Sequence, residues 1–210
     1  MVIVNEVMTY LYTFENIDTV INCLAQNMSS PFINPKMLIG HLSYLKESYA
    51  NSSNTLMKDK FFYHTLKLDN ITIHIHFNIK VATNLIKQYP IRKIEFNRLT
   101  PSNAIDLNAS VYYVEQDKRE LQPHHFYLQD PVILIRYPVN EKIPYIVIDG
   151  NHRITAKKLT TQTINGVCID PLQHHDIFFN EFDFAFYQTM RYLQDCLILN
   201  NPLIQKKLLF

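Results

Sequence analysis

The five residues Asp149-Gly150-Asn151-His152-Arg153 combine the groups that a phosphate site needs. They follow a short run of apolar strand formers and open a segment of helical composition. Backbone N–H groups in the first turn of a helix lack intrahelical partners and carry the positive end of the helix dipole, so an anion is favoured there. Gly150 allows a ligand to come close to the backbone, and His152 and Arg153 add donors at the same end. The pattern predicts a phosphate-binding turn.

This segment resembles the ParB/sulfiredoxin-like (ParB-like nuclease domain) superfamily, in which a strand runs into a glycine, a basic pair and an alanine-bearing helix. The residues that match are Asp149 to Arg153 and Ala156. The preceding 128–135 segment resembles the family's strand that begins with a proline, and 163–169 resembles its closing strand. The resemblance covers about residues 92–171, and it implies a mixed-sheet core.

The resemblance also implies a function, because the glycine-led helix of that family binds nucleotide phosphates. It implies a nucleotide-binding protein that acts as a nucleotide-dependent phosphotransferase or nucleotidase, with phosphates at Gly150, Asn151, His152 and Arg153. Asp149 and His152 are then the expected catalytic residues. Mg²⁺ would bridge the phosphates of a nucleoside triphosphate or diphosphate, with Asp149 holding it directly or through water, and a small molecule would be the acceptor. The alternative is a non-catalytic module, related to partition proteins, that senses nucleotide or binds a protein or DNA partner.

Departures from the family narrow these expectations. Sulfiredoxins carry a reactive cysteine where this chain has Asn151, so we do not expect cysteine repair chemistry. Beyond Pro171 the sequence has room for one aromatic-rich helix and a short tail, not for the helix-turn-helix domain of partition proteins, so DNA is a less favoured partner. The serine-kinase branch needs an upstream carboxylate base. The candidates, by proximity in sequence only, are Asp106, Glu115, Asp117 and Glu120.

Arg153 also has a structural interpretation. It can be a residue that stabilises the fold through a salt bridge to the C-terminal helix, for example to Asp183 or Asp195. A phosphate-binding arginine and a structural arginine differ in what Arg153→Ala changes: ligand affinity in one case, stability of the ligand-free protein in the other.

The histidines and cysteines are weaker candidates. His74 and His76 alternate with apolar residues on the polar face of a predicted strand, but a metal site needs a third ligand, and we expect no metal there. The three cysteines form no CxxC pair, which argues against a disulfide framework or a thiolate zinc site and fits a reducing cytoplasm.

Composition excludes several classes of protein. Hydrophobic residues make up 47% of the 210 residues and charged residues 19%, so the chain is expected to fold rather than remain disordered. The formal net charge of +1 argues against general coating of nucleic acid. No run approaches the roughly 18 apolar residues of a membrane span, and the first 14 residues lack the basic region of an export signal, so we expect no membrane partner.

Periodicity predicts an α+β protein. Helical spacing covers residues 16–28 and 35–49, with Asn34 as the N-cap of the second helix, and alternation predicts a hairpin from 61–68 and 71–79. A polar loop is expected at 51–54 and a short helix at 81–88.

In the second half, strands are expected at 93–99, 131–137 and 143–148, and a helix at 151–159. Asn165-Gly166 predicts a turn before a short strand at 167–169. Apolar residues from Phe179 to Leu197 predict a long amphipathic helix. We therefore expect an N-terminal α+β lobe of unknown role (1–90), a ParB/sulfiredoxin-like core (91–171) and a C-terminal helix packed on that core (172–210).

Overall fold

The computed structural model describes residues 16–52, 61–68, 71–99, 130–137, 144–158 and 161–199. The segments that link the expected strands, 69–70 and 138–142, and the side chain of His152 lie outside this description. So do the four carboxylates named above as candidate bases, namely Asp106, Glu115, Asp117 and Glu120.

The protein is α+β, and its described residues form helices and two separate β-sheets. It divides into two compact units, each built from segments far apart in sequence. The first contains residues 1–57, 65–75 and 180–210, and the second contains 58–64 and 76–179. These boundaries differ from the three consecutive segments expected from the sequence, because the C-terminal helix belongs with the N-terminal helices.

Among its described residues, the first unit contains the helices α2 (Ile17–Ala25), α3 (Pro35–Ser52) and α7 (Glu181–Leu199). Each of the first two helices is preceded by an asparagine whose side chain accepts hydrogen bonds from backbone N–H groups of the first turn. Asn16 accepts from Asp18, and Asn34 accepts from Lys36 and Met37. Helix α3 extends through Ser52, so the first two residues of the polar loop expected at 51–54 are helical, and residues 53–54 lie outside the described part of the chain.

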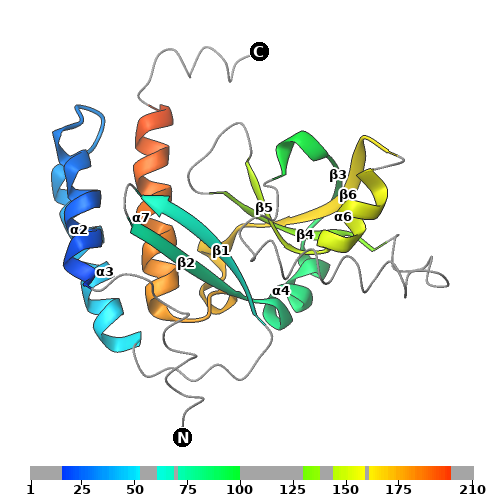
Figure 1. Ribbon diagram of the computed structural model, residues 1–210, viewed down its shortest axis with the longest axis horizontal. Helices are drawn as coiled ribbons and strands as arrows, with labels where there is room; N and C mark the ends of the chain where they lie inside the picture. Colours follow the sequence, from blue (N-terminus) through cyan, green and yellow to red (C-terminus); the bar gives the residue numbers. More distant parts are fainter. Residues whose placement is uncertain are drawn as a thin grey trace, which may run out of the picture. The chain divides into compact units, whose positions relative to one another are not determined.

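Helix α7 packs along α3, and the two lie side by side in both ribbon views (Figure 1). The Tyr44 hydroxyl of α3 donates a hydrogen bond to the Glu181 carboxylate of α7. At the other end of the pair, the Tyr192 hydroxyl donates to the Asn34 carbonyl at 3.2 Å. The apolar stripe of α7 therefore packs on a helix, whereas the sequence suggested that it would pack on the sheet of the central core.

Strands β1 (Phe61–Leu68) and β2 (Ile71–Asn78) form a two-stranded sheet, as the alternating pattern predicts. The apolar residues of β2 at odd positions from 71 to 77 are buried. His76, on the other face, is also buried, with only 2% of its surface exposed, because the rings of Tyr63 and Phe179 lie against it at 6.1 and 6.3 Å between centroids.

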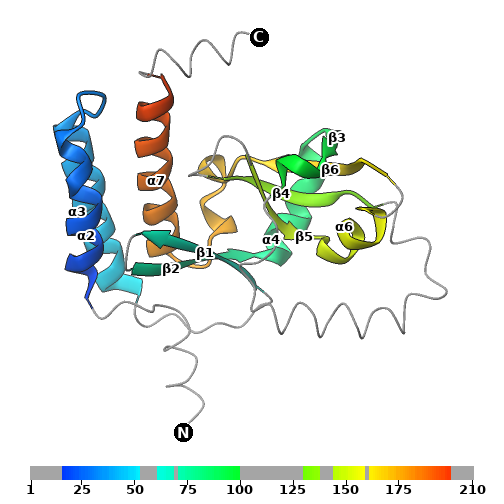
Figure 2. The same cartoon turned by 45° about the horizontal axis from the view of Figure 1, so that its top comes forward.

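The second unit holds a four-stranded sheet with the order β3-β6-β4-β5. The strands are β3 (Ile91–Glu95), β4 (Val132–Arg136), β5 (Tyr145–Asp149) and β6 (Thr163–Ile169). Strands β4 and β6 are parallel, and the other two pairings are antiparallel. Helix α6 (Asn151–Lys158) connects β5 to β6, and Figure 2 shows it beside the sheet.

Shorter elements connect the hairpin to this sheet. Helix α4 spans Ile79–Leu85 and continues as a 3-10 turn, Ile86–Gln88. A single helix was expected at 81–88, so the helical segment begins two residues earlier and its last turn is 3-10. Strand β3 begins two residues earlier than predicted and ends at Glu95, where the 3-10 turn Phe96–Arg98 follows. Two further 3-10 turns, Pro171–Gln173 and His175–Ile177, lead to the end of the unit.

The turn predicted at Asn165-Gly166 is wrong, because β6 runs unbroken from Thr163 to Ile169. Gly166 faces the centre of the sheet, where a Cβ would lie 2.9 Å from Cδ1 of Leu134 and 3.2 Å from Cγ1 of Ile94. This glycine therefore serves close packing in a strand rather than chain reversal.

Strand β4 is buried and apolar on both faces from Val132 to Ile135, which explains why it shows no polar alternation. One face carries an apolar cluster formed by Ile94, Leu99, Val132, Leu134, Val147 and Ile164. Ile154 of α6 packs against this cluster, so the helix that begins at the predicted phosphate turn is anchored on the sheet.

Candidate functional site

The turn between β5 and α6 depends on Gly150. Its φ angle is +98°, a region that side-chain-bearing residues rarely adopt. A Cβ at this position would lie 2.6 Å from Cγ1 of Val132 and 2.9 Å from Nη2 of Arg153. The glycine lets the chain leave the sheet edge and enter the helix within one residue.

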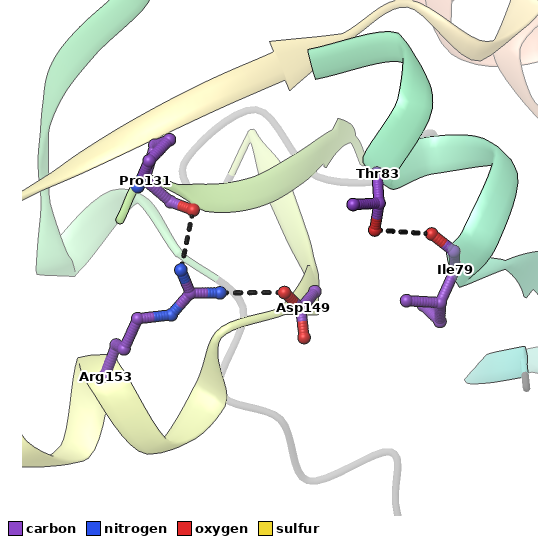
Figure 3. Close-up of polar contacts among 5 residues, drawn as sticks. All are labelled: Ile79, Thr83, Pro131, Asp149 and Arg153. Carbon is purple, nitrogen blue, oxygen red and sulfur yellow. Dashed lines mark hydrogen bonds and ion pairs between the residues drawn. The ribbon is translucent and has the colours of Figure 1, made fainter. Parts of the chain in front are cut away.

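Arg153 folds back over this turn and joins three segments (Figure 3). Its Nη2 lies 2.7 Å from Oδ2 of Asp149, the last residue of β5, and its Nη1 donates to the carbonyl of Pro131 at 3.0 Å. The Arg153 side chain is only 15% exposed, whereas that of Asp149 is 41% exposed. The guanidinium therefore holds the start of β4, the end of β5 and the first turn of α6 together.

The partner of Arg153 differs from the partners suggested by the sequence. Asp195 pairs with Arg191 at 2.9 Å within α7, and Asp183 belongs to the other unit. The i, i+4 spacing of Asp149 and Arg153 was visible in the sequence. The carbonyl of Pro131 was not, because its position depends on the pairing of β4 with β5.

The N-terminus of α6 presents backbone donors. The N–H of Ile154 donates to the Gly150 carbonyl at 3.0 Å, so the intrahelical ladder begins there. The three preceding N–H groups, those of Asn151, His152 and Arg153, have no carbonyl four residues back within the helix. Together with the helix dipole they form the local geometry that suits an oxyanion. Of the residues predicted to bind phosphate, the structure thus brings together Gly150 and these three backbone groups.

Asp149, the last residue of β5, supplies a carboxylate group at this turn. It is partly exposed, and one of its oxygens already bonds Arg153. Over the described residues there is no group of three or more His, Cys, Asp or Glu side chains arranged to hold a metal ion. Mg²⁺ bound with a nucleotide usually takes only one or two carboxylates, the remaining ligands being phosphate oxygens and water, so Asp149 alone is chemically compatible with it.

The histidines of β2 do not share one environment. The Nδ1 of His74 lies 2.9 Å from the Thr65 hydroxyl, whereas His76 is enclosed by aromatic rings. Their strand alternation predicted a common polar face, which the burial of His76 contradicts.

No family model, curated protein or solved structure matches this chain. In the part of the chain that the structure describes, no helix is long and apolar enough to cross a bilayer.

Proposed function

We propose that this protein binds a nucleoside triphosphate or diphosphate, with its phosphates at the turn from Asp149 to Arg153. The observation that carries the proposal is the turn itself: a glycine at φ +98° directs a buried strand into a helix whose first three N–H groups have no acceptor within the helix. The sequence resemblance implies a mixed-sheet core in which a strand runs through a glycine into a helix. The mixed sheet and the β5-α6 turn support that expectation, and we propose the ParB/sulfiredoxin-like fold for residues 91–171.

The contacts of Arg153 refine its role in this proposal. Two of its nitrogens bond Asp149 and Pro131, so the guanidinium holds the turn in shape rather than projecting toward solvent. We assign the direct phosphate contacts to the N–H groups of Asn151, His152 and Arg153, and we assign the Arg153 side chain a positioning role. A phosphate that bonded this guanidinium as well would compete with the Asp149 carboxylate.

The reaction we propose is phosphoryl transfer to a small acceptor or to water. In such reactions most of the catalysis comes from positioning and from stabilising charge on the transferring group. Among the described residues, Asp149 has the carboxylate closest in sequence to the N–H donors of α6. It would hold Mg²⁺ through its partly exposed oxygens. His152 remains the candidate acid or base on the residue pattern.

The experiment compares two substitutions at one position. Asn151→Pro removes one N–H donor while keeping the helix, because proline suits the first helical residue. Asn151→Ala removes the same side chain and keeps the N–H. Binding of nucleoside mono-, di- and triphosphates, with and without Mg²⁺, is measured by calorimetry and by the rise in melting temperature that a native-state ligand produces.

We expect the proline variant to bind at least about tenfold more weakly than the alanine variant, since a charge-assisted hydrogen bond contributes about 1.5–3 kcal/mol. Equal affinities of folded Asn151→Pro and Asn151→Ala, or no binding of any nucleotide by the parent protein, would reject the site. A phosphate-release assay with a nucleoside triphosphate separates the two functions. An enzyme releases inorganic phosphate over time, whereas a module that only senses nucleotide binds the triphosphate without cleaving it.

A further inference from the structure

A second group of chemically active side chains surrounds Cys168 of β6. In the strand register Arg92 lies opposite Gly166, and Leu134 lies opposite Cys168. Side chains two residues apart on a strand share a face. Arg92 of β3 and Arg136 of β4 therefore lie on either side of the Cys168 thiol, on the face that carries the apolar cluster. Both arginines are exposed, and Cys168 is half-buried.

This group is distinct from the turn at Gly150. Val132 begins β4 next to Gly150, and Arg136 ends the same strand four residues later. Four strand residues span about 13 Å. The two places thus lie at opposite ends of one strand, and a ligand at Arg136 does not depend on the proposed function.

The charges around the thiol are mostly positive. Burial, assisted by the Asp170 carboxylate, raises the pKa of Cys168 to about 11, although Arg92 and Arg136 act in the opposite direction. The Asp170 oxygens accept hydrogen bonds from the N–H of Leu172 at 3.2 Å and from Nε2 of Gln173 at 3.4 Å. This carboxylate is thus engaged in capping the next turn.

A hydrogen-bonded tyrosine and histidine lie beside these groups. The Tyr89 hydroxyl is 2.5 Å from Nε2 of His174, and the two rings are 5.7 Å apart between centroids. Burial raises the pKa of Tyr89, and Asp170 and the Cys168 thiol also raise it. At neutral pH the hydroxyl therefore keeps its proton and is a neutral polar group close to Asp170 and the Cys168 thiol.

We propose that Arg92 and Arg136 bind a small oxyanion beside the Cys168 thiol. Guanidinium groups bind phosphate and carboxylate oxygens through paired, charge-assisted hydrogen bonds. The thiol is neutral at physiological pH, so it does not repel the anion. The ligand class is a small molecule that presents a phosphate or a carboxylate group.

The Cys168 thiol is a built-in reporter for this binding. An anion that neutralises the two arginines removes their stabilisation of the thiolate and slows alkylation, which proceeds through the thiolate. The wild-type protein is treated with iodoacetamide at about pH 8.5, where the thiolate is a minor species. Inorganic phosphate or succinate replaces chloride at constant ionic strength, and peptide mass spectrometry follows each cysteine separately.

We expect alkylation of Cys168 to slow about threefold, with saturation, which is the effect of removing a unit charge a few ångströms away across water. Cys23 and Cys196 are internal controls and should keep their rates. Slowing by phosphate alone, by succinate alone or by both identifies which oxyanion the arginines accept.

The variant Arg92→Gln/Arg136→Gln should lose the response, whereas Lys93→Gln should retain it. Lys93 is the matched control, because it carries the same charge on the same strand and its position places it on the opposite face. If the double variant does not fold, the single variant Arg92→Gln is used, and its response should be weaker than that of Lys93→Gln. An unchanged Cys168 rate in both anions, a response shared by all three cysteines, or a full response in the folded arginine variants would overturn the proposal.

Discussion

Replacing Arg153 with alanine tests whether this side chain stabilises the turn. The substitution removes the ion pair to Asp149 at 2.7 Å and the hydrogen bond to the Pro131 carbonyl at 3.0 Å. Asp149 is 41% exposed, so water compensates for much of the lost ion pair, and we assign that pair about 0.5–1 kcal/mol. The bond to the partly buried carbonyl adds about 1–1.5 kcal/mol.

We therefore expect Arg153→Ala to lower the free energy of unfolding by about 2 kcal/mol. For a protein of this size that corresponds to a melting temperature lower by about 4–8 °C. The assay is urea and thermal unfolding of the ligand-free protein, with nucleotide affinity measured on the same samples below the transition. Because the backbone donors stay in place, affinity per folded molecule should fall by less than about tenfold.

Two controls accompany this variant. Arg153→Lys keeps the charge but cannot reach both partners with a planar fork, so its stability should lie between those of the parent and the alanine variant. Arg98→Ala removes an exposed arginine whose guanidinium lies 5.4 Å from the centre of the Tyr145 ring, and it should cost no more than about 1 kcal/mol. An unchanged melting temperature together with a large loss of affinity would refute the positioning role and return Arg153 to direct phosphate contact.

Three further substitutions test local packing and burial at Gly150, Gly166 and His64. Gly150→Ala should destabilise by about 3 kcal/mol, because it combines an unfavourable positive φ with a 2.6 Å approach to Val132, and unfolding curves measure this. Gly166→Val should cost roughly 1–3 kcal/mol through overpacking, and a gain in stability would show that β6 has room there. Burial lowers the pKa of His64 to about 4 from its ordinary 6.5. As the pH falls, His64 binds a proton near pH 6.5 in the unfolded chain but only near pH 4 in the folded protein. The free energy of unfolding should therefore decrease between about pH 6.5 and pH 4, by up to about 3 kcal/mol. In His64→Phe this part of the pH dependence should disappear, and an identical pH profile would contradict the assignment.

Several elements could be predicted from local sequence because their determinants lie within a few residues. Asn34 followed by Pro35 marks the start of α3, and the structure shows the Asn34 side chain capping that helix. Strict alternation located β2, and the Gly150 break located the junction of β5 and α6. At Asn34 and Gly150 one residue type satisfies a local backbone requirement, and in β2 the two-residue period of a strand is written directly in the sequence.

Other features required long-range contacts that no local pattern contains. Asn165-Gly166 reads as a turn by itself, but the neighbouring strands draw it into β6, where Gly166 admits Leu134. His76 follows a polar alternation, yet it is buried because Phe179, far away in sequence, lies against it.

For the candidate site, the sequence by itself determined the chemistry of the turn: a glycine able to reverse the backbone, a helix start and a basic residue one turn further on. Only the tertiary structure decided how that arginine is used. The pairing of β4 with β5 places the Pro131 carbonyl within reach of Arg153 and beside Asp149. A guanidinium takes the hydrogen-bond partners that the assembled backbone offers, and those partners depend on strands that are separate in the sequence.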